Sequence, residues 1–185
     1  MHLPREYVGR NHETLGSDIL AVLKAVTLPE RTLGPDLAKR LQAVRPDQWY
    51  PIGLLLEAFE VLAEKLGDYG LHHVGWELFK LSHADSVRAN VRSAHQLLHG
   101  FHSIYRNVNR GQGIGGWKVL TFEPGLAVME KTTPHHCKVE EGIMEEAMRT
   151  LGIRVEVNQS QCLRKGAAAC HFVLRSPVTD ERWNG

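Results

Sequence analysis

Residues 117–130 read WKVLTFEPGLAVME, in which two short apolar runs flank the tripeptide EPG. Such a tripeptide is typical of a tight turn, so the two runs (117–122 and 126–130) predict a β-hairpin. Apolar and polar residues alternate in 153–157 (IRVEV) and again in 168–174 (AACHFVL). This alternation is the pattern of a half-buried strand, so the last third of the chain predicts four strands.

One helix is expected between the two pairs of strands. It follows Pro134 and ends at Gly152, and its core-facing positions are Ile143, Met144, Ala147 and Met148. Glu140 shares this face, so a buried Glu140 would need a polar partner. The order of elements in this part of the chain is therefore β-β-α-β-β.

Helical spacing of apolar residues predicts that the preceding part is mostly helical. The expected helices span 14–26, 34–41, 52–66, 69–81 and 85–108, with a helix entry at 47–51. We therefore expect an α+β fold, in which N-terminal helices and the long helix 85–108 pack on a four-stranded antiparallel sheet. We divide the chain into a helical extension (1–50), a ligand-binding domain (51–176) and a tail (177–185).

Composition narrows the range of functions. The 185 residues are 43% hydrophobic and 23% charged, with a formal net charge of +1. Near-neutral charge argues against nucleic acid or an anionic membrane as an obligate partner. No apolar run resembles a signal peptide or a membrane span, so we expect a cytoplasmic protein.

Three cysteines, Cys137, Cys162 and Cys170, all lie in the last third of the chain. An odd number does not suit a disulfide framework. If the helix packs on the sheet, the three thiols converge, and zinc is a candidate metal. The fourth ligand would come from His135, His136, His171 or Glu140. Two alternatives stay open: Cys170 is a small core residue in phase with Phe172 and Leu174, or Cys137 and Cys170 are an unused thiol pair.

These residues resemble the four-vinyl-reductase domain family, over about the last 60 residues. The matching positions are Pro134-His135-His136-Cys137, Gly142, Gly152, Cys162-Leu163-Arg164-Lys165-Gly166, Cys170 and Phe172. The resemblance implies a relative of hydrocarbon-binding proteins, of the sensor halves of phenol-responsive activators and, more distantly, of the vesicle-tethering TRAPP subunits. In the aromatic-sensing members, the cysteines hold zinc with an acid three residues before the second cysteine. That position is Gln159 here, a weaker ligand.

A stripe of histidines, His95, His99 and His102, follows one face of the expected long helix. Histidines beside an apolar stripe could ligate a metal or haem, titrate near neutral pH or hydrogen-bond an internal ligand. They could equally border the core and reach solvent.

The layout also resembles, distantly, the haem–nitric-oxide-binding (H-NOX) domain. His102 falls where that family keeps its haem-ligating histidine. The family's Y-x-S-x-R signature for the haem propionates would fall at 131–135, where this chain has KTTPH. Propionate binding would therefore lack its usual hydrogen-bond and charge partners.

These observations predict a ligand-binding sensor with a mostly apolar pocket between the long helix and the sheet. We expect the lining to comprise Trp76, Phe79, His95, His99, His102, Trp117 and Phe122, and the ligand to be a small hydrophobic or aromatic molecule. Signalling would pass through a homodimer or a separate protein. The alternatives are a haem-based gas sensor that uses His102 or His99, and an accessory protein of a tetrapyrrole vinyl reductase. No nucleophile motif or hydride-cofactor site favours an enzyme.

Overall fold

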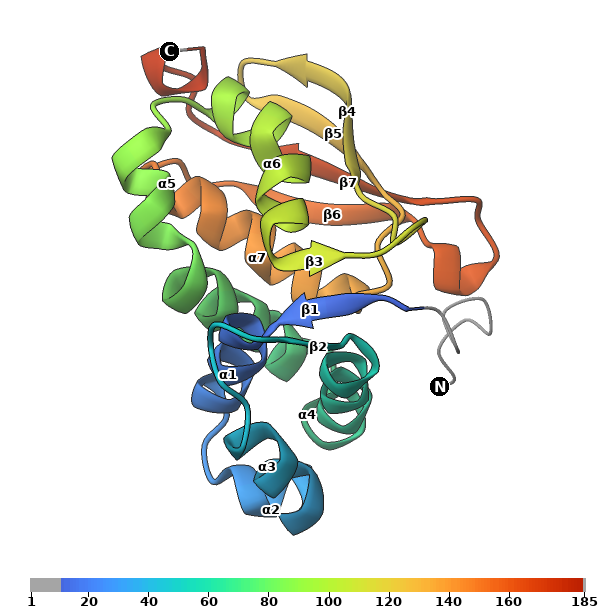
Figure 1. The fold of residues 1–185 in the computed structure, drawn as a ribbon. Helices are drawn as coiled ribbons and strands as arrows, with labels where there is room; N and C mark the ends of the chain where they lie inside the picture. Colours follow the sequence, from blue (N-terminus) through green and yellow to red (C-terminus); the bar gives the residue numbers. More distant parts are fainter. Residues whose placement is uncertain (1–10, 185) are drawn as a thin grey trace.

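The computed structural model describes residues 11–184. The helices are α1 (Gly16–Ala25), α2 (Pro29–Leu33), α3 (Pro35–Gln42), α4 (Gly53–Ser82), α5 (Ala84–Asn90), α6 (Ala94–Val108) and α7 (Cys137–Thr150). The strands are β1 (Glu13–Leu15), β2 (Trp49–Pro51), β3 (Asn109–Arg110), β4 (Trp117–Glu123), β5 (Leu126–Lys131), β6 (Glu156–Gln161) and β7 (Cys170–Arg175). In Figure 1, α1 to α4 form one end of the molecule, and the larger sheet with α6 and α7 forms the other.

The larger sheet has the strand order β4-β5-β7-β6, and all its neighbouring strands are antiparallel. The expected α+β class, the hairpin and the β-β-α-β-β order are confirmed. The third strand begins at Glu156, later than expected. The reason is that the Ile153 N–H donates to the carbonyl of Met148 and so belongs to the end of α7.

The expected long helix 85–108 is wrong as a single element, because the chain leaves helical geometry between α5 and α6. Val91 is extended, with φ −116° and ψ 135°. The Ser93 side chain then accepts a hydrogen bond from the Gln96 N–H and starts α6 as an N-cap. The break expected between the helices 52–66 and 69–81 is present, because Gly67 inside α4 leaves helical geometry (φ 64°, ψ −169°).

A second, three-stranded sheet was not predicted. Its order is β2-β1-β3, so β1 joins the amino-terminal end of the molecule to the end of α6 (Figure 1). Residues 49–51, expected as a helix entry, form its edge strand β2. Strands of two or three residues are too short for alternation to reveal them.

The amino-terminal helices and the larger sheet share one hydrophobic core. Ile19 and Val22 of α1 are fully buried, and α1 packs against α4. Trp183, in the expected tail, is also fully buried. The division at residues 50 and 176 stays a prediction, and residues 1–10 of the expected extension lie outside the described part. Within residues 11–184, no helix combines the length and the apolarity needed to cross a membrane.

Helices α4 and α7 cross at unusually short range through two glycines. A Cβ atom added to Gly75 of α4 would lie 2.0 Å from the Val139 carbonyl oxygen of α7. A Cβ atom added to Gly142 of α7 would lie 2.0 Å from the His72 carbonyl oxygen of α4. Only glycine permits this approach on either side. The crossing fixes the position of the first turn of α7, where the candidate site residues lie.

Candidate functional site: a buried polar cavity and a cysteine cluster

A small cavity lies where α1, α4, α6 and α7 meet the start of β3 and of β4. Its volume is about 30 Å³. Most of its wall is apolar or aromatic, comprising Leu78, Phe79, Phe101, Ile104, Tyr105, Val108, Trp117 and Ile143. Five polar side chains complete it, namely Asp18, His83, Asn109, His135 and Glu140.

Three of these polar side chains are almost completely buried and keep one atom without a hydrogen-bond partner. Asp18 is 2% exposed, Asn109 1% and His135 5%. The atoms concerned are Asp18 Oδ1, Asn109 Oδ1 and His135 Nε2. Burying an unpaired polar atom costs roughly 1–3 kcal/mol, so each of these three atoms calls for a polar partner such as water.

His135 is held by Glu140 of the first turn of α7. Its Nδ1 atom lies 3.2 Å from Glu140 Oε1, and the Thr133 hydroxyl donates to the same oxygen at 2.9 Å. Burial alone would raise the pKa of Glu140, but the hydrogen bond and charge of His135 outweigh it and lower that pKa. Glu140 is therefore a carboxylate whose partner the sequence could not identify.

Only two of the seven predicted lining residues line this cavity. Phe79 and Trp117 line the cavity. Trp76 lies elsewhere: its Nε1–H donates to Glu145 at 3.2 Å, and the Arg149 guanidinium lies 4.0 Å from its ring centroid. As a ligand contact, Trp76 stays a prediction.

The histidine stripe faces outward, and all three side chains of His95, His99 and His102 are exposed. The rings of His95 and His99 stack with centroids 4.1 Å apart, and both contact Phe122 edge-on. His102 Nδ1 accepts a hydrogen bond from the Trp117 N–H at 3.3 Å. These four aromatic side chains also lie outside the cavity, so their role as ligand contacts remains a prediction.

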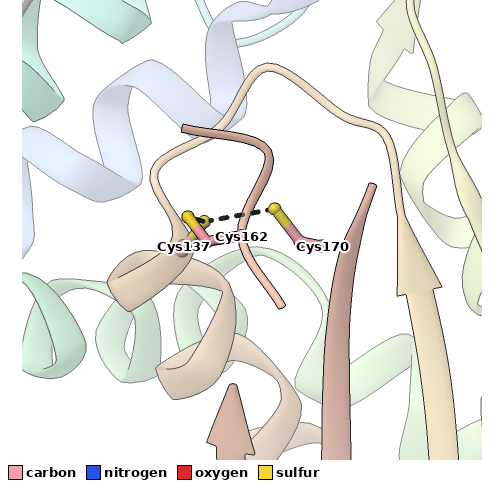
Figure 2. A group of neighbouring side chains, drawn as sticks. All are labelled: Cys137, Cys162 and Cys170. Atoms are coloured by element: carbon pink, nitrogen blue, oxygen red, sulfur yellow. Dashed lines mark hydrogen bonds between the residues drawn. The ribbon is translucent and has the colours of Figure 1, made fainter. Parts of the chain in front are cut away.

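The three cysteines come together, as Figure 2 shows. Cys137 begins α7, Cys162 follows β6 and Cys170 begins β7. The Cys137 sulfur lies 3.8 Å from that of Cys162 and 3.5 Å from that of Cys170. In residues 11–184, no other group of three or more His, Cys, Asp or Glu side chains is arranged to hold a metal ion.

The pKa of Cys137 is lowered and that of Cys170 is raised within this cluster. A hydrogen bond from Cys170 lowers the pKa of Cys137 to about 4 despite burial, and the charge of Lys131 contributes. The buried Lys131 ammonium lies 3.8 Å from the Cys137 sulfur and donates to the His135 carbonyl oxygen at 2.6 Å. The same hydrogen bond and burial raise the pKa of Cys170, which therefore stays a thiol.

The four residues considered as a fourth metal ligand are engaged elsewhere. The His136 Nδ1 atom caps α7 by accepting from the Lys138 N–H, and His171 lies 3.4 Å from Glu130. His135 and Glu140 pair with each other. Gln159 instead lowers the pKa of Cys137 through a hydrogen bond.

We expect removal of the Cys170 thiol to raise the pKa of Cys137, because the Cys170 hydrogen bond is the largest cause of the shift. The thiolate absorbance of metal-free protein, followed in the ultraviolet against pH, measures this. One thiol should titrate near pH 4 in the unaltered protein. Its midpoint should rise clearly in Cys170→Ala and less in the matched Cys162→Ala variant. Equal midpoints in all three proteins would contradict this assignment.

Sequence reasoning missed Asp18 and Asn109. Asp18 lies four residues before Val22 and one before Ile19, on the buried side of α1. A charged residue in phase with an apolar stripe could therefore have identified it as a buried polar group. Asn109 follows the last turn of α6 and carries no such signal. His135 was considered only as a metal ligand.

The fold is that of an α+β domain, and solved structures similar to it define its class more closely. No family model matches this sequence, and no curated protein matches it. An H-NOX protein from S. oneidensis in the Fe(II) state superposes with a TM-score of 0.68 at 15% identity, over 91% of this chain and 99% of that one. Fe(II) unliganded H-NOX from K. algicida gives 0.66 at 12% identity, over 89% and 97%. The chain therefore has the H-NOX fold, whereas these comparisons do not confirm the four-vinyl-reductase resemblance.

Haem does not fit the residues of this structure. A pocket for a drug-sized ligand measures about 300–1,000 Å³, and the cavity here holds about 30 Å³. At the expected propionate positions, the Lys131 ammonium bonds the His135 carbonyl oxygen and the Thr133 hydroxyl bonds Glu140. The His102 ring lies against Gly116, where an added Cβ atom would be 2.3 Å from Nδ1.

Proposed function

We propose that this chain is a sensor domain of the H-NOX architecture whose ligand occupies the polar cavity beside His135. The observation that carries the proposal is the set of three buried polar atoms without partners around one cavity. A binding site of this kind combines an apolar wall with a few polar groups that orient the ligand. We also propose that the protein acts in the cytoplasm and passes its signal through a homodimer or a separate signalling protein.

The position of the cavity suits a sensor. Its walls come from α1, α4, α6 and α7, so an occupant contacts both the amino-terminal helices and the helix that covers the sheet. A ligand shifts a conformational equilibrium only if it binds the two conformations with different affinity. An occupant that contacts elements from both ends of the molecule can bind two conformations with different affinity, because its contacts change when these elements move.

Native mass spectrometry of protein purified from its own host tests the site. We expect a bound species that is retained in His99→Ala, on the exposed stripe, and lost in Ile104→Phe, which fills the cavity. Ile104 is half-buried at the cavity wall, so the larger ring has an outlet and the fold should persist. A bound species retained in Ile104→Phe and lost in His99→Ala would place the site on the stripe instead.

Haem-based gas sensing is the second candidate function. Solved proteins of this fold are described in Fe(II) and Fe(II)NO states, and His102 lies on α6 at the position expected for an iron ligand. The small cavity and the engaged Lys131 and Thr133 side chains argue against it. Kinship with four-vinyl-reductase proteins, and an accessory role in tetrapyrrole reduction, stay predictions from the sequence.

We also propose zinc at Cys137, Cys162 and Cys170 as a structural ion. Tetrahedral zinc with Zn–S bonds of about 2.3 Å separates its sulfurs by about 3.8 Å. The Cys137 sulfur lies 3.8 Å from that of Cys162 and 3.5 Å from that of Cys170, close to that value. Zinc analysis should give about one ion per chain, lost in Cys137→Ser and unchanged in His136→Gln. If zinc is removed and the protein is as stable as before, the proposal is wrong.

A further inference from the structure

Two histidines on the outer face of α6 form a pair that the proposed function does not use. His95 and His99 are one helical turn apart, and both side chains are exposed. Their rings stack, with centroids 4.1 Å apart and planes inclined by 30°. Two imidazoles on adjacent turns of one helix lie on the same face, where an ion from solvent can reach both.

The His99 ring is already oriented as a metal ligand. Its Nδ1–H donates to the His95 carbonyl oxygen at 2.9 Å, since a carbonyl oxygen can only accept. Histidines that ligate metals usually donate their second N–H in this way, which leaves Nε2 for the ion. Within residues 11–184, no hydrogen bond engages His99 Nε2 or either ring nitrogen of His95. Both rings can therefore offer a nitrogen to the same ion.

Phe122 of β4 supports the pair from one side. Its ring contacts both imidazoles edge-on, with its centroid 5.1 Å from that of His95 and 5.8 Å from that of His99. These contacts restrict the rotation of both histidine side chains. Less side-chain entropy is therefore lost when an ion binds.

The spacing of the two rings is close to that of a chelate. With metal–nitrogen bonds of about 2.0–2.1 Å and angles of about 90–110° at the ion, two imidazole centroids lie about 4.5–5.2 Å apart. The observed separation is 4.1 Å. Exposed side chains cover a difference of about 1 Å or less by small rotations within their rotamers.

The donor set indicates the class of ion. Imidazole nitrogen suits zinc, copper and nickel, whereas magnesium and calcium prefer oxygen ligands. Among the described residues, no third His, Cys, Asp or Glu side chain completes a set of three with this pair, so water must fill the remaining positions. The same spacing binds zinc in H-E-x-x-H enzymes, but the residue after the first histidine is Gln96 here, which cannot act as their general base. The pair is therefore suited to holding an ion and not to hydrolysis.

We propose that His95 and His99 chelate a divalent transition-metal ion of the zinc, copper and nickel class at the surface of α6. His95 lies in the first turn of α6, which follows the non-helical residues 91–93. An ion shared with His99 links this turn to the next and stabilises the start of the helix. The pair lies outside the cavity, so this inference is independent of the proposed function. Treatment with a chelator before native mass spectrometry keeps the two sites apart.

Calorimetric titration of the untagged full chain with nickel chloride tests this proposal, at about pH 7.5, where exposed histidines are mostly neutral. Nickel is the probe because it does not oxidise the three cysteines. We expect a site for one nickel ion per chain that is lost in His95→Ala and in His99→Ala, and no binding of magnesium. Both variants should fold, because alanine favours a helix and the replaced side chains are exposed.

Two further variants make the test specific. His73→Ala on α4 is the matched control, because it removes another exposed histidine and should keep the site. The double variant of His95 and His99 distinguishes a chelate from two separate sites. In a chelate, either single substitution lowers the nickel affinity at least tenfold and the second adds little, whereas separate sites give similar losses that add.

Nickel affinity that is unchanged in His99→Ala would overturn the proposal, because the ion would then bind elsewhere, such as at the cysteines. Additive losses in the double variant would overturn it as well, and so would the absence of nickel binding to the unaltered protein. None of these results affects the proposed function, which is tested by the species lost in Ile104→Phe.

Discussion

Gly142→Ala should destabilise the protein by roughly 1–3 kcal/mol, the usual cost of forcing an extra carbon into a close-packed contact. The added Cβ atom would lie 2.0 Å from the His72 carbonyl oxygen. Backbone atoms cannot turn aside as a flexible side chain can, so α4 and α7 must move apart. Urea unfolding followed by circular dichroism measures the loss.

Gly100→Ala is the matched control for this prediction. Gly100 also lies inside a helix, α6, but a Cβ atom added there meets nothing within 4 Å. Because alanine favours a helix over glycine, this variant should gain roughly 0.5–1 kcal/mol. Equal stability changes in the two variants would show that the α4–α7 contact is looser than the structure indicates.

His135→Ala should cost about 3 kcal/mol at neutral pH, because removing one partner of a buried pair leaves the other charge uncompensated. The partner is Glu140, whose carboxylate is 2% exposed. The control is His171→Ala, which breaks the pair with Glu130 at 3.4 Å, where both side chains are partly exposed. Its effect should stay within about 1 kcal/mol.

Acid should narrow the difference in stability between the His135→Ala variant and the unaltered protein. The folded state lowers the pKa of Glu140, so its contribution to stability is present above the unfolded pKa of the carboxyl group and is lost as the pH falls through the lower folded value. Without His135, burial raises that pKa instead. The unaltered protein should lose stability on acidification below about pH 5, whereas the variant should lose less or even gain. Parallel curves for the two proteins would contradict this account.

The sequence was sufficient for the elements whose periodicity is long and regular. The hairpin around Glu123-Pro124-Gly125 and the β-β-α-β-β order follow from alternation and from turn residues. The break between α5 and α6 could not be read in this way, since Val91, Arg92 and Ser93 interrupt no apolar repeat. The small sheet of β1, β2 and β3 depends on pairing between segments almost 100 residues apart, which no local pattern records.

The candidate site shows the same limit. Convergence of Cys137, Cys162 and Cys170 was expected because the helix start and the strand ends meet in any such α+β unit. The cavity was not expected, because it depends on side chains from α1, α6 and α7 that belong to no common sequence motif. Residues 95–102 attracted attention by their spacing, yet spacing alone does not say which side of a helix faces the core. His102 is exposed and accepts a hydrogen bond from the Trp117 N–H.

A haem titration tests most directly the central claim that the polar cavity serves as the ligand site in place of a haem pocket. Purified protein and His102→Ala would each be titrated with haem under reducing conditions while the Soret absorbance is recorded. We predict no saturable band at one haem per chain and no difference between the two proteins. A stoichiometric Soret band that shifts with nitric oxide and disappears in His102→Ala would contradict the claim and establish the haem-based sensor instead.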